Sequence, residues 1–302
     1  MTTTVSLKTS RDSFHMAKTI GKGDNPHFSE SNVHTCSISD SVALRIHPDT
    51  KPLNMKIANL QKGMIFMFNG AEVVGEGTGF GVPIGKYSNE IFFSGSSFLQ
   101  VQKQNNFVII RKEFLMDLIE RSKFRNLKLE NMKLREIMDS VSLLSQKHKH
   151  LAQFILLTKG LLFKFGVKST FVRTVPKGKV IVNYIVDRNR ILVKLSFSEL
   201  DRTNLQKVFM LNEQGAHFFR KYSDSEGLNL DDEEIGVWDN VMAQSAKIVD
   251  SQGRIGFSLK NVEGTVLRRG REVIKGHLDW IGLDYELNPE DDQFEYEIEI
   301  FG

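Results

Sequence analysis

The chain has a single cysteine, Cys36, among its 302 residues. One cysteine cannot form an intrachain disulfide, and no cysteine-rich metal site can be built around it. A chain of this length buries enough apolar surface to fold without either kind of cross-link. We therefore expect no disulfide and no structural metal.

Long apolar runs and targeting segments are also missing. The most apolar stretch, 151–165, is interrupted by Lys159 and Lys164 and is too short to cross a bilayer. Residues 1–13 are rich in Thr and Ser and lack the apolar core of a signal peptide. These absences predict a soluble, cytoplasmic protein that has no membrane partner.

Neither positive nor negative charge is in large excess, since the formal net charge is only +3. So small a charge gives no basic footprint for nucleic acid. Its distribution is uneven: 102–150 holds 11 Lys or Arg against 6 Asp or Glu, whereas 279–302 holds nine acidic residues and no Lys or Arg. We expect two solvated faces that attract each other within or between molecules, so self-association stays open.

Tyrosine and tryptophan are few: there are 22 Phe but only 5 Tyr and 2 Trp. Phenylalanine has no polar group and mainly fills cores. The aromatic content therefore weighs against a broad, exposed platform for sugars.

What the sequence does contain is a succession of short apolar runs separated by Gly, Asn and Asp, at a spacing typical of sandwiches and barrels. No strand–helix–strand alternation is visible. Residues 1–40 form a polar, irregular N-terminal segment, for which a loose tail and an irregular first hairpin are the two alternatives. We expect 41–302 to form one mainly β domain, a large antiparallel two-sheet sandwich. In architecture alone this is similar to the β-supersandwich of sugar epimerases and polysaccharide lyases.

The periodicity changes between 112 and 146. One helical face would collect Leu134, Ile137, Met138, Val141 and Leu144. A shorter segment shows similar spacing at Phe114, Leu115, Leu118 and Ile119. We expect one or two amphipathic helices inserted at about 112–146.

The most distinctive motif is GEGTGFGVP at 75–83. A dinucleotide loop needs a helix after its glycines, but Pro83 and another strand-like run follow here. The kinase-like order of glycines is one residue out of step, and the partner motifs of a kinase are absent from the sequence. We therefore expect no nucleotide and no other cofactor.

Glycine at every second position of a strand, Gly75 to Gly81, would instead leave one face without side chains. Such a strip admits another part of the chain or a flat ligand such as a sugar ring. Either occupant makes Gly77→Val or Gly79→Val disruptive. The opposite face would present Glu76 and Thr78.

Each tryptophan has an aspartate as neighbour, in Trp238-Asp239 and Asp279-Trp280. Adjacent strand residues face opposite ways, so Trp280 is expected to share a face with Asp284 rather than with Asp279. Aromatic rings beside carboxylates suit sugar recognition, and burial in a core is the structural alternative.

No catalytic motif is present, and the candidates for acid–base work are Asp239, His277 and Asp279. Two carboxylates act together when they lie about 5–10 Å apart, which spacing in sequence does not fix. The basic run that includes Arg271 is expected near a turn, where it would bind an anion or simply be exposed.

We expect a β protein that binds a carbohydrate or similar polar ligand, with lyase, epimerase or hydrolase activity left open. The expected ligand-binding residues are Glu76, Thr78, Trp238, Trp280 and Arg271. The alternative is a non-catalytic structural or assembly protein that uses its charged surfaces. A pocket holding a Trp, a carboxylate and a His or Arg is the feature that an enzyme requires here.

Overall fold

The computed structural model describes residues 3–7, 34–47, 60–88, 90–104, 107–124, 167–274 and 278–302. These ranges form twenty β-strands and one short 3-10 helix, and every strand pairing is antiparallel. The prediction of a mainly β protein is confirmed. None of the helical structure in these ranges is long and apolar enough to cross a membrane.

The elements are β1 (Thr3–Leu7), β2 (His34–Ser37), β3 (Val42–Ile46), β4 (Met64–Phe68), β5 (Ala71–Glu72), β6 (Gly79–Tyr87), β7 (Glu90–Gln104), β8 (Phe107–Phe124), β9 (Val167–Arg173), β10 (Lys179–Asp187), β11 (Arg190–Ser196), β12 (Leu205–Gln214), β13 (Phe219–Asp224), β14 (Asn229–Asp231), η1 (Asp232–Glu234), β15 (Asp239–Asn240), β16 (Ser245–Asp250), β17 (Gly256–Lys260), β18 (Val266–Ile274), β19 (Leu278–Leu287) and β20 (Gln293–Phe301).

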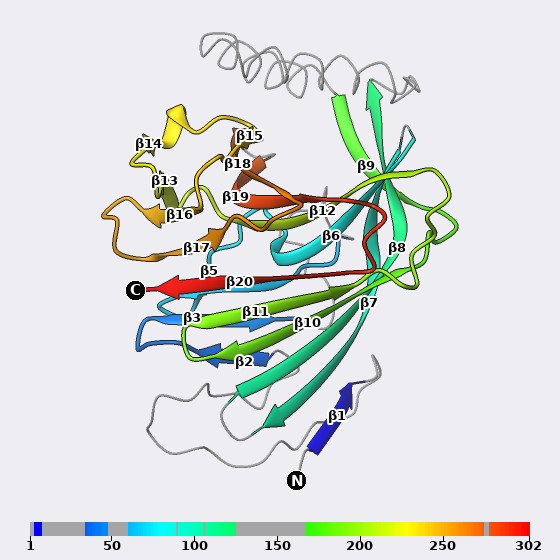
Figure 1. Cartoon of the computed structure of the whole chain (residues 1–302), viewed down its shortest axis with the longest axis horizontal. Helices are drawn as coiled ribbons and strands as arrows, with labels where there is room; N and C mark the ends of the chain where they lie inside the picture. The colour runs from blue at the N-terminus through cyan, green and yellow to red at the C-terminus, as the bar shows by residue number, and fades with distance from the viewer. Residues whose placement is uncertain are drawn as a thin grey trace.

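Two long strands, β7 and β8, connect two groups of strands (Figure 1). On one side β7 pairs with β6, and pairing continues through β12 and β19 to β18. We call these four strands the β12 layer. On the other side β8 pairs with β10, and pairing continues through β11 and β20 to β17. We call these four strands the β20 layer.

Aromatic and polar side chains join the two layers. The Phe80 and Phe257 rings meet edge to face with centroids 4.9 Å apart. The Tyr296 hydroxyl donates to Asn212 Oδ1 at 2.7 Å. The side of the β12 layer that meets these contacts is the inner side, and its opposite is the outer side. The inner side belongs to the buried apolar core, whose burial drives folding.

The last strand, β20, alternates in burial, with Tyr296, Ile298 and Ile300 buried between more exposed glutamates. It is an interior strand of the sheet, because it pairs with both β11 and β17. The acidic residue Glu295 forms an ion pair of 2.9 Å with Lys194 of β11. Part of the acidic face is therefore neutralised within the chain.

The helix expected at about 112–146 is wrong for residues 112–124, which belong to β8. Phe114, Met116 and Leu118 are buried at every second position, which is the period of a strand. The charged residue Lys112 occupies the same row and is fully buried, and this hides the alternation in the sequence. The rest of the predicted helical segment, 125–146, lies outside the described residues. The polar N-terminal segment 1–40 contains the strands β1 and β2.

The glycine run is not one regular strand. Gly75 lies in a turn with φ of +54°, and β6 starts only at Gly79. Gly79 and Gly81 have φ of +83° and +75°, a region that favours glycine. The expectation of a flat strip along 75–81 is corrected by these turns.

The chain itself lies against these glycines. A Cβ atom on Gly81 would be 2.6 Å from the Tyr184 ring, and one on Gly79 would be 2.9 Å from the Met64 carbonyl oxygen. The Tyr184 hydroxyl donates to the carbonyl of Gly81 at 2.8 Å. Close packing of the chain, rather than a ligand, therefore explains the bare positions at the start of β6.

Gly79→Val tests this packing, with Gly70→Val as a matched control. Both glycines have positive φ, but a Cβ on Gly70 would meet nothing within 4 Å. Both variants carry backbone strain, and Gly79→Val adds overpacking of about 1–3 kcal/mol. We expect denaturant unfolding to show a larger loss of stability for Gly79→Val. Equal losses would mean that Gly79 has no close neighbour.

Candidate functional site

Four acidic residues lie on the outer side of the β12 layer: Glu213, Glu272, Asp284 and Glu286. We call them the carboxyl cluster. Strand register places them together, because directly opposed residues point to the same side of a sheet. Glu213 is opposite Gly282, Asp284 is opposite Arg268, and Glu272 is opposite Trp280.

Glu213 is a buried member of the cluster, with 6% of its surface exposed. Its Oε2 accepts hydrogen bonds from the Thr78 amide at 3.2 Å and the Thr78 hydroxyl at 3.1 Å. Burial raises the pKa of Glu213 to about 7, although Thr78 and the Lys62 charge oppose the shift. A carboxyl group with such a pKa can both give and take a proton near neutral pH.

Asp284 is still more buried, at 1% exposure. Its Oδ1 accepts a hydrogen bond of 2.6 Å from the Asn212 amide, and its Oδ2 has no hydrogen-bond partner among the described residues. Burial and the nearby Glu213 carboxylate raise the pKa of Asp284 well above its usual value. Asp284 therefore keeps its proton to higher pH than an ordinary aspartate does.

Lys62 brings a buried cation to the same region. Its Nζ donates to the carbonyl of Gly77, next to the Thr78 that binds Glu213. Burial lowers the pKa of Lys62 to about 8, while nearby carboxylates, Glu213 first, oppose the shift. Lys112 donates to the carbonyls of Lys62 and His47 and so fixes the backbone beneath.

The two tryptophans stack beside the cluster, with ring centroids 4.8 Å apart and an interplanar angle of 24°. Trp280 is buried and Trp238 is half-buried. The Trp280 ring lies over Gly270, where a Cβ would come within 2.9 Å of it. Trp238 has φ of +65°, an unusual value for this residue type, and the strain is consistent with a functional constraint.

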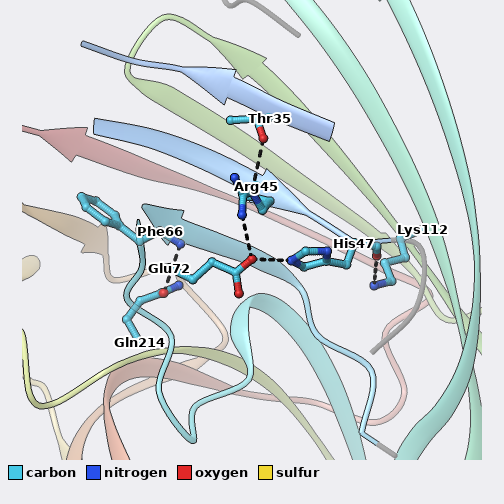
Figure 2. A network of polar contacts seen from close by, with 7 residues as sticks. All are labelled: Thr35, Arg45, His47, Phe66, Glu72, Lys112 and Gln214. Atoms are coloured by element: carbon cyan, nitrogen blue, oxygen red, sulfur yellow. Dashed lines mark hydrogen bonds and ion pairs between the residues drawn. The ribbon is translucent and has the colours of Figure 1, made fainter. Parts of the chain in front are cut away.

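A second network lies around Glu72 (Figure 2). Its carboxylate accepts hydrogen bonds from Arg45 at 3.0 Å and His47 at 2.6 Å. The hydrogen bond with His47 is the main cause that lowers the pKa of Glu72 to about 2. Gln214 bonds the backbone of β4 through Phe66. Because Arg45 and His47 share one oxygen of Glu72, and Gln214 bonds β4, the network holds β3, β4 and β5 together.

The predicted residues Asp239 and Arg271 lie on the inner side of the β12 layer. Asp239 is 3.4 Å from Arg269, its register partner in β18, and Arg271 is 3.5 Å from Asp232. The basic run is in the middle of β18, so its expected place near a turn is wrong. These residues point away from the carboxyl cluster.

The predicted Asp279 pairs with His217, whose ring is half-exposed. Asp279 also accepts a backbone hydrogen bond of 3.2 Å from Glu76. The separation of Asp279 from Trp280 on opposite sides of β19 agrees with these contacts. His277 lies outside the described residues.

Of the predicted residues, Thr78, Trp238 and Trp280 thus lie on the outer side of the β12 layer. The other three, Asp239, Asp279 and Arg271, lie on the opposite side. Sequence reasoning missed Lys62 and Glu213. The available signal for Glu213 was the polar triplet 212–214 that ends an otherwise apolar strand, all of which is buried. No comparable pattern marks Lys62.

A hollow of about 430 Å³ lies where the segment after β15 meets β16 and β17, and it is lined by Met242, Gln244, Ser245, Lys260 and Asn261. It contains neither a tryptophan nor a carboxylate nor a histidine. It is therefore not the enzyme pocket that the sequence interpretation requires.

Comparison with known proteins leaves the chain without a family: no family model matches it. No curated protein matches it either. Among solved structures, the alpha-N-acetylgalactosaminidase NagBb from Bifidobacterium bifidum, in complex with GalNAc, is 8% identical with a TM-score of 0.44; the match covers 88% of this chain and 35% of that one. This chain thus spans about a third of the length of that enzyme.

A second structure, HI1317, is 7% identical over 99% of both chains, with a TM-score of 0.33. Both scores are below 0.5, so neither similarity identifies the fold or the function of this chain.

The raised pKa of Glu213 predicts a pH-dependent stability. Protonated Glu213 stabilises the folded state, so this contribution is present below its usual pKa of 4.5 and is lost as pH rises through about 7. We expect the free energy of unfolding to fall over that range, with a slope of up to about 1.4 kcal/mol per pH unit. Asp284 acts in the same direction.

Glu213→Gln removes the titrating group and should flatten the curve measured by urea unfolding across this pH range. Exposed Glu290→Gln is the control and should keep the wild-type slope. Parallel curves for wild type and Glu213→Gln would contradict the assigned environment.

Proposed function

We propose that this protein binds a saccharide or similar polyhydroxyl ligand on the outer side of the β12 layer. The observation that carries the proposal is the joint position of the carboxyl cluster and the Trp238–Trp280 stack on that side. Ligand sites combine aromatic surface with a few polar groups that fix orientation. A sugar offers both an apolar face of C–H groups and a rim of hydroxyls.

The protonation states of the cluster suit hydroxyl groups, which donate and accept hydrogen bonds. Glu213, with a pKa near neutrality, would donate or accept. Arg268, paired with Glu286, would donate at the more exposed margin. Half-buried Trp238 would pack against the apolar face of the ring.

Proton transfer by Glu213 is the part of the proposal that concerns catalysis. A positioned carboxyl of suitable pKa serves lyases, epimerases and hydrolases alike. The geometry supports Glu213 as the proton donor or acceptor, with Thr78 and Lys62 as its positioning residues. The hollow described above lacks the tryptophan, carboxylate and histidine or arginine that an enzyme requires here, so we propose a binding protein, and catalysis by Glu213 is an outcome that an activity assay would reveal.

The two-sheet supersandwich is the fold that we propose for this ligand site. Support comes from the contacts that join the β12 and β20 layers, such as Phe80 with Phe257. On the outer side of the β12 layer, half-buried Trp238 and Arg268 are the groups that a ligand would reach first, because Glu213, Asp284 and Trp280 are buried.

The alternative, an assembly protein that uses charged surfaces, loses support from β20. Glu295 finds its cation, Lys194, within the same chain. Glu299 lies opposite Arg190 in the register of β11 and β20. The acidic strand therefore has intramolecular partners, although self-association remains an outcome that light scattering would reveal.

Tryptophan fluorescence tests the proposal directly, because the chain has only 2 Trp and they form the stack. We expect saturable changes in emission when neutral or acidic oligosaccharides are titrated. Trp238→Phe should weaken binding about twofold to tenfold, since aromatic contacts contribute about 0.5–1.5 kcal/mol beyond the area that they bury.

Glu213→Gln should also weaken binding, while Glu295→Gln in the β20 layer, an exposed ion-paired glutamate, serves as the control. An emission spectrum that no saccharide changes, together with an unchanged melting temperature, would contradict the proposed function.

A further inference from the structure

The segment that follows Trp238 runs along the outermost strand of the site. Asn240 pairs with Arg268, and the Val241 amide donates to the Leu267 carbonyl at 2.8 Å. The segment is thus extended beside β18, and alternate side chains point to the same side. Trp238 is on the outer side because it stacks on Trp280.

Alternation gives Asn240 and Met242 the same direction as Trp238. The intervening residues confirm it, because Asp239 reaches Arg269 on the inner side and Val241 is buried at 3% exposure. Asn240 is exposed, and Met242 is 82% exposed. Trp238, Asn240 and Met242 form a row at the margin of the site, which we call the outer row.

The outer row ends at the hollow of about 430 Å³, which has Met242 in its wall. A volume of this size is within the range of small-ligand sites, about 300–1,000 Å³. Its other lining residues are polar: Gln244, Ser245, Lys260 and Asn261. Asn261 donates to the Val241 carbonyl at 3.2 Å and so fixes the end of the row. Amide, hydroxyl and ammonium groups around one apolar side chain suit a second sugar ring.

We propose that the ligand is a linear oligosaccharide that extends from the tryptophan stack along the outer row into this hollow. The inference rests on the proposed function and narrows its substrate class. Four residue steps from Trp238 to Met242 span about 13 Å of extended strand, which exceeds the length of one sugar ring. A monosaccharide would contact the tryptophan stack and leave the hollow unused.

The test compares affinities for saccharides of increasing length. Cello-oligosaccharides, chito-oligosaccharides and oligogalacturonides of one to four units are titrated against tryptophan emission and, independently, by calorimetry. We expect at least one series to bind, with affinity rising about tenfold or more from one unit to four. The gain should be lost in Met242→Ala/Gln244→Ala, while binding of the single unit stays at the wild-type level.

Val175→Ala is the matched control, because Val175 is an apolar side chain of similar exposure, 81%, that follows β9. It should bind every length as the wild type does. Equal affinity for one and four units, or a length-dependent gain that survives in Met242→Ala/Gln244→Ala, would overturn the inference and leave the proposed function standing. Absence of binding at every length in all three series would overturn both.

Discussion

The structure depends on how buried charges are held on the outer side of the β12 layer. Glu213 and Lys62 are each less than a tenth exposed, and unpaired burial of either would cost several kcal/mol. Thr78 stabilises buried Glu213 by donating two hydrogen bonds to one carboxylate oxygen. The carbonyl of Gly77 does the same for Lys62. The turn at 75–78 therefore lowers the energetic cost of burying these groups.

Glycines make this turn possible. Gly77 leaves room for the Glu213 backbone, since a Cβ there would be 3.1 Å from the Glu213 carbonyl oxygen. Gly81 admits Tyr184 from the β20 layer. The glycine motif 75–83 thus contacts the carboxyl cluster near its start, and near its end it makes room for Tyr184 at the junction of the two layers. Its composition resembles a phosphate loop, but its contacts are with the chain.

Much of the fold is predictable from the sequence, because the apolar alternation of strands such as β20 follows directly from one-sided burial. The alternation of β8 is less visible, since fully buried Lys112 interrupts it. Whether such a segment becomes a strand or a helix depends on pairing with residues distant in the sequence, and the periodicity of one segment gives no information about that pairing. The same holds for φ at Gly75, which turns a strand-like glycine pattern into a bend.

The candidate site was only half predictable. Residue type and spacing pointed to Trp238, Trp280 and Thr78. Strand register and the Trp238–Trp280 stack place the tryptophans on the outer side of the β12 layer, where Thr78 bonds Glu213. Lys62 and Glu213 are 151 positions apart in the numbering and meet only through the turn at 75–78. Asp239 and Arg271 have suitable chemistry but face inward, because strand direction, rather than residue type, decides which side a group serves.

The central claim is that the cluster holds a carboxyl poised to exchange its proton near neutral pH. Carbon-13 NMR of the side-chain carboxyl of Glu213, assigned with Glu213→Gln and titrated between pH 3 and 9, measures this most directly. The account predicts a midpoint near 7. A midpoint at the ordinary glutamate value of 4.5 would contradict it.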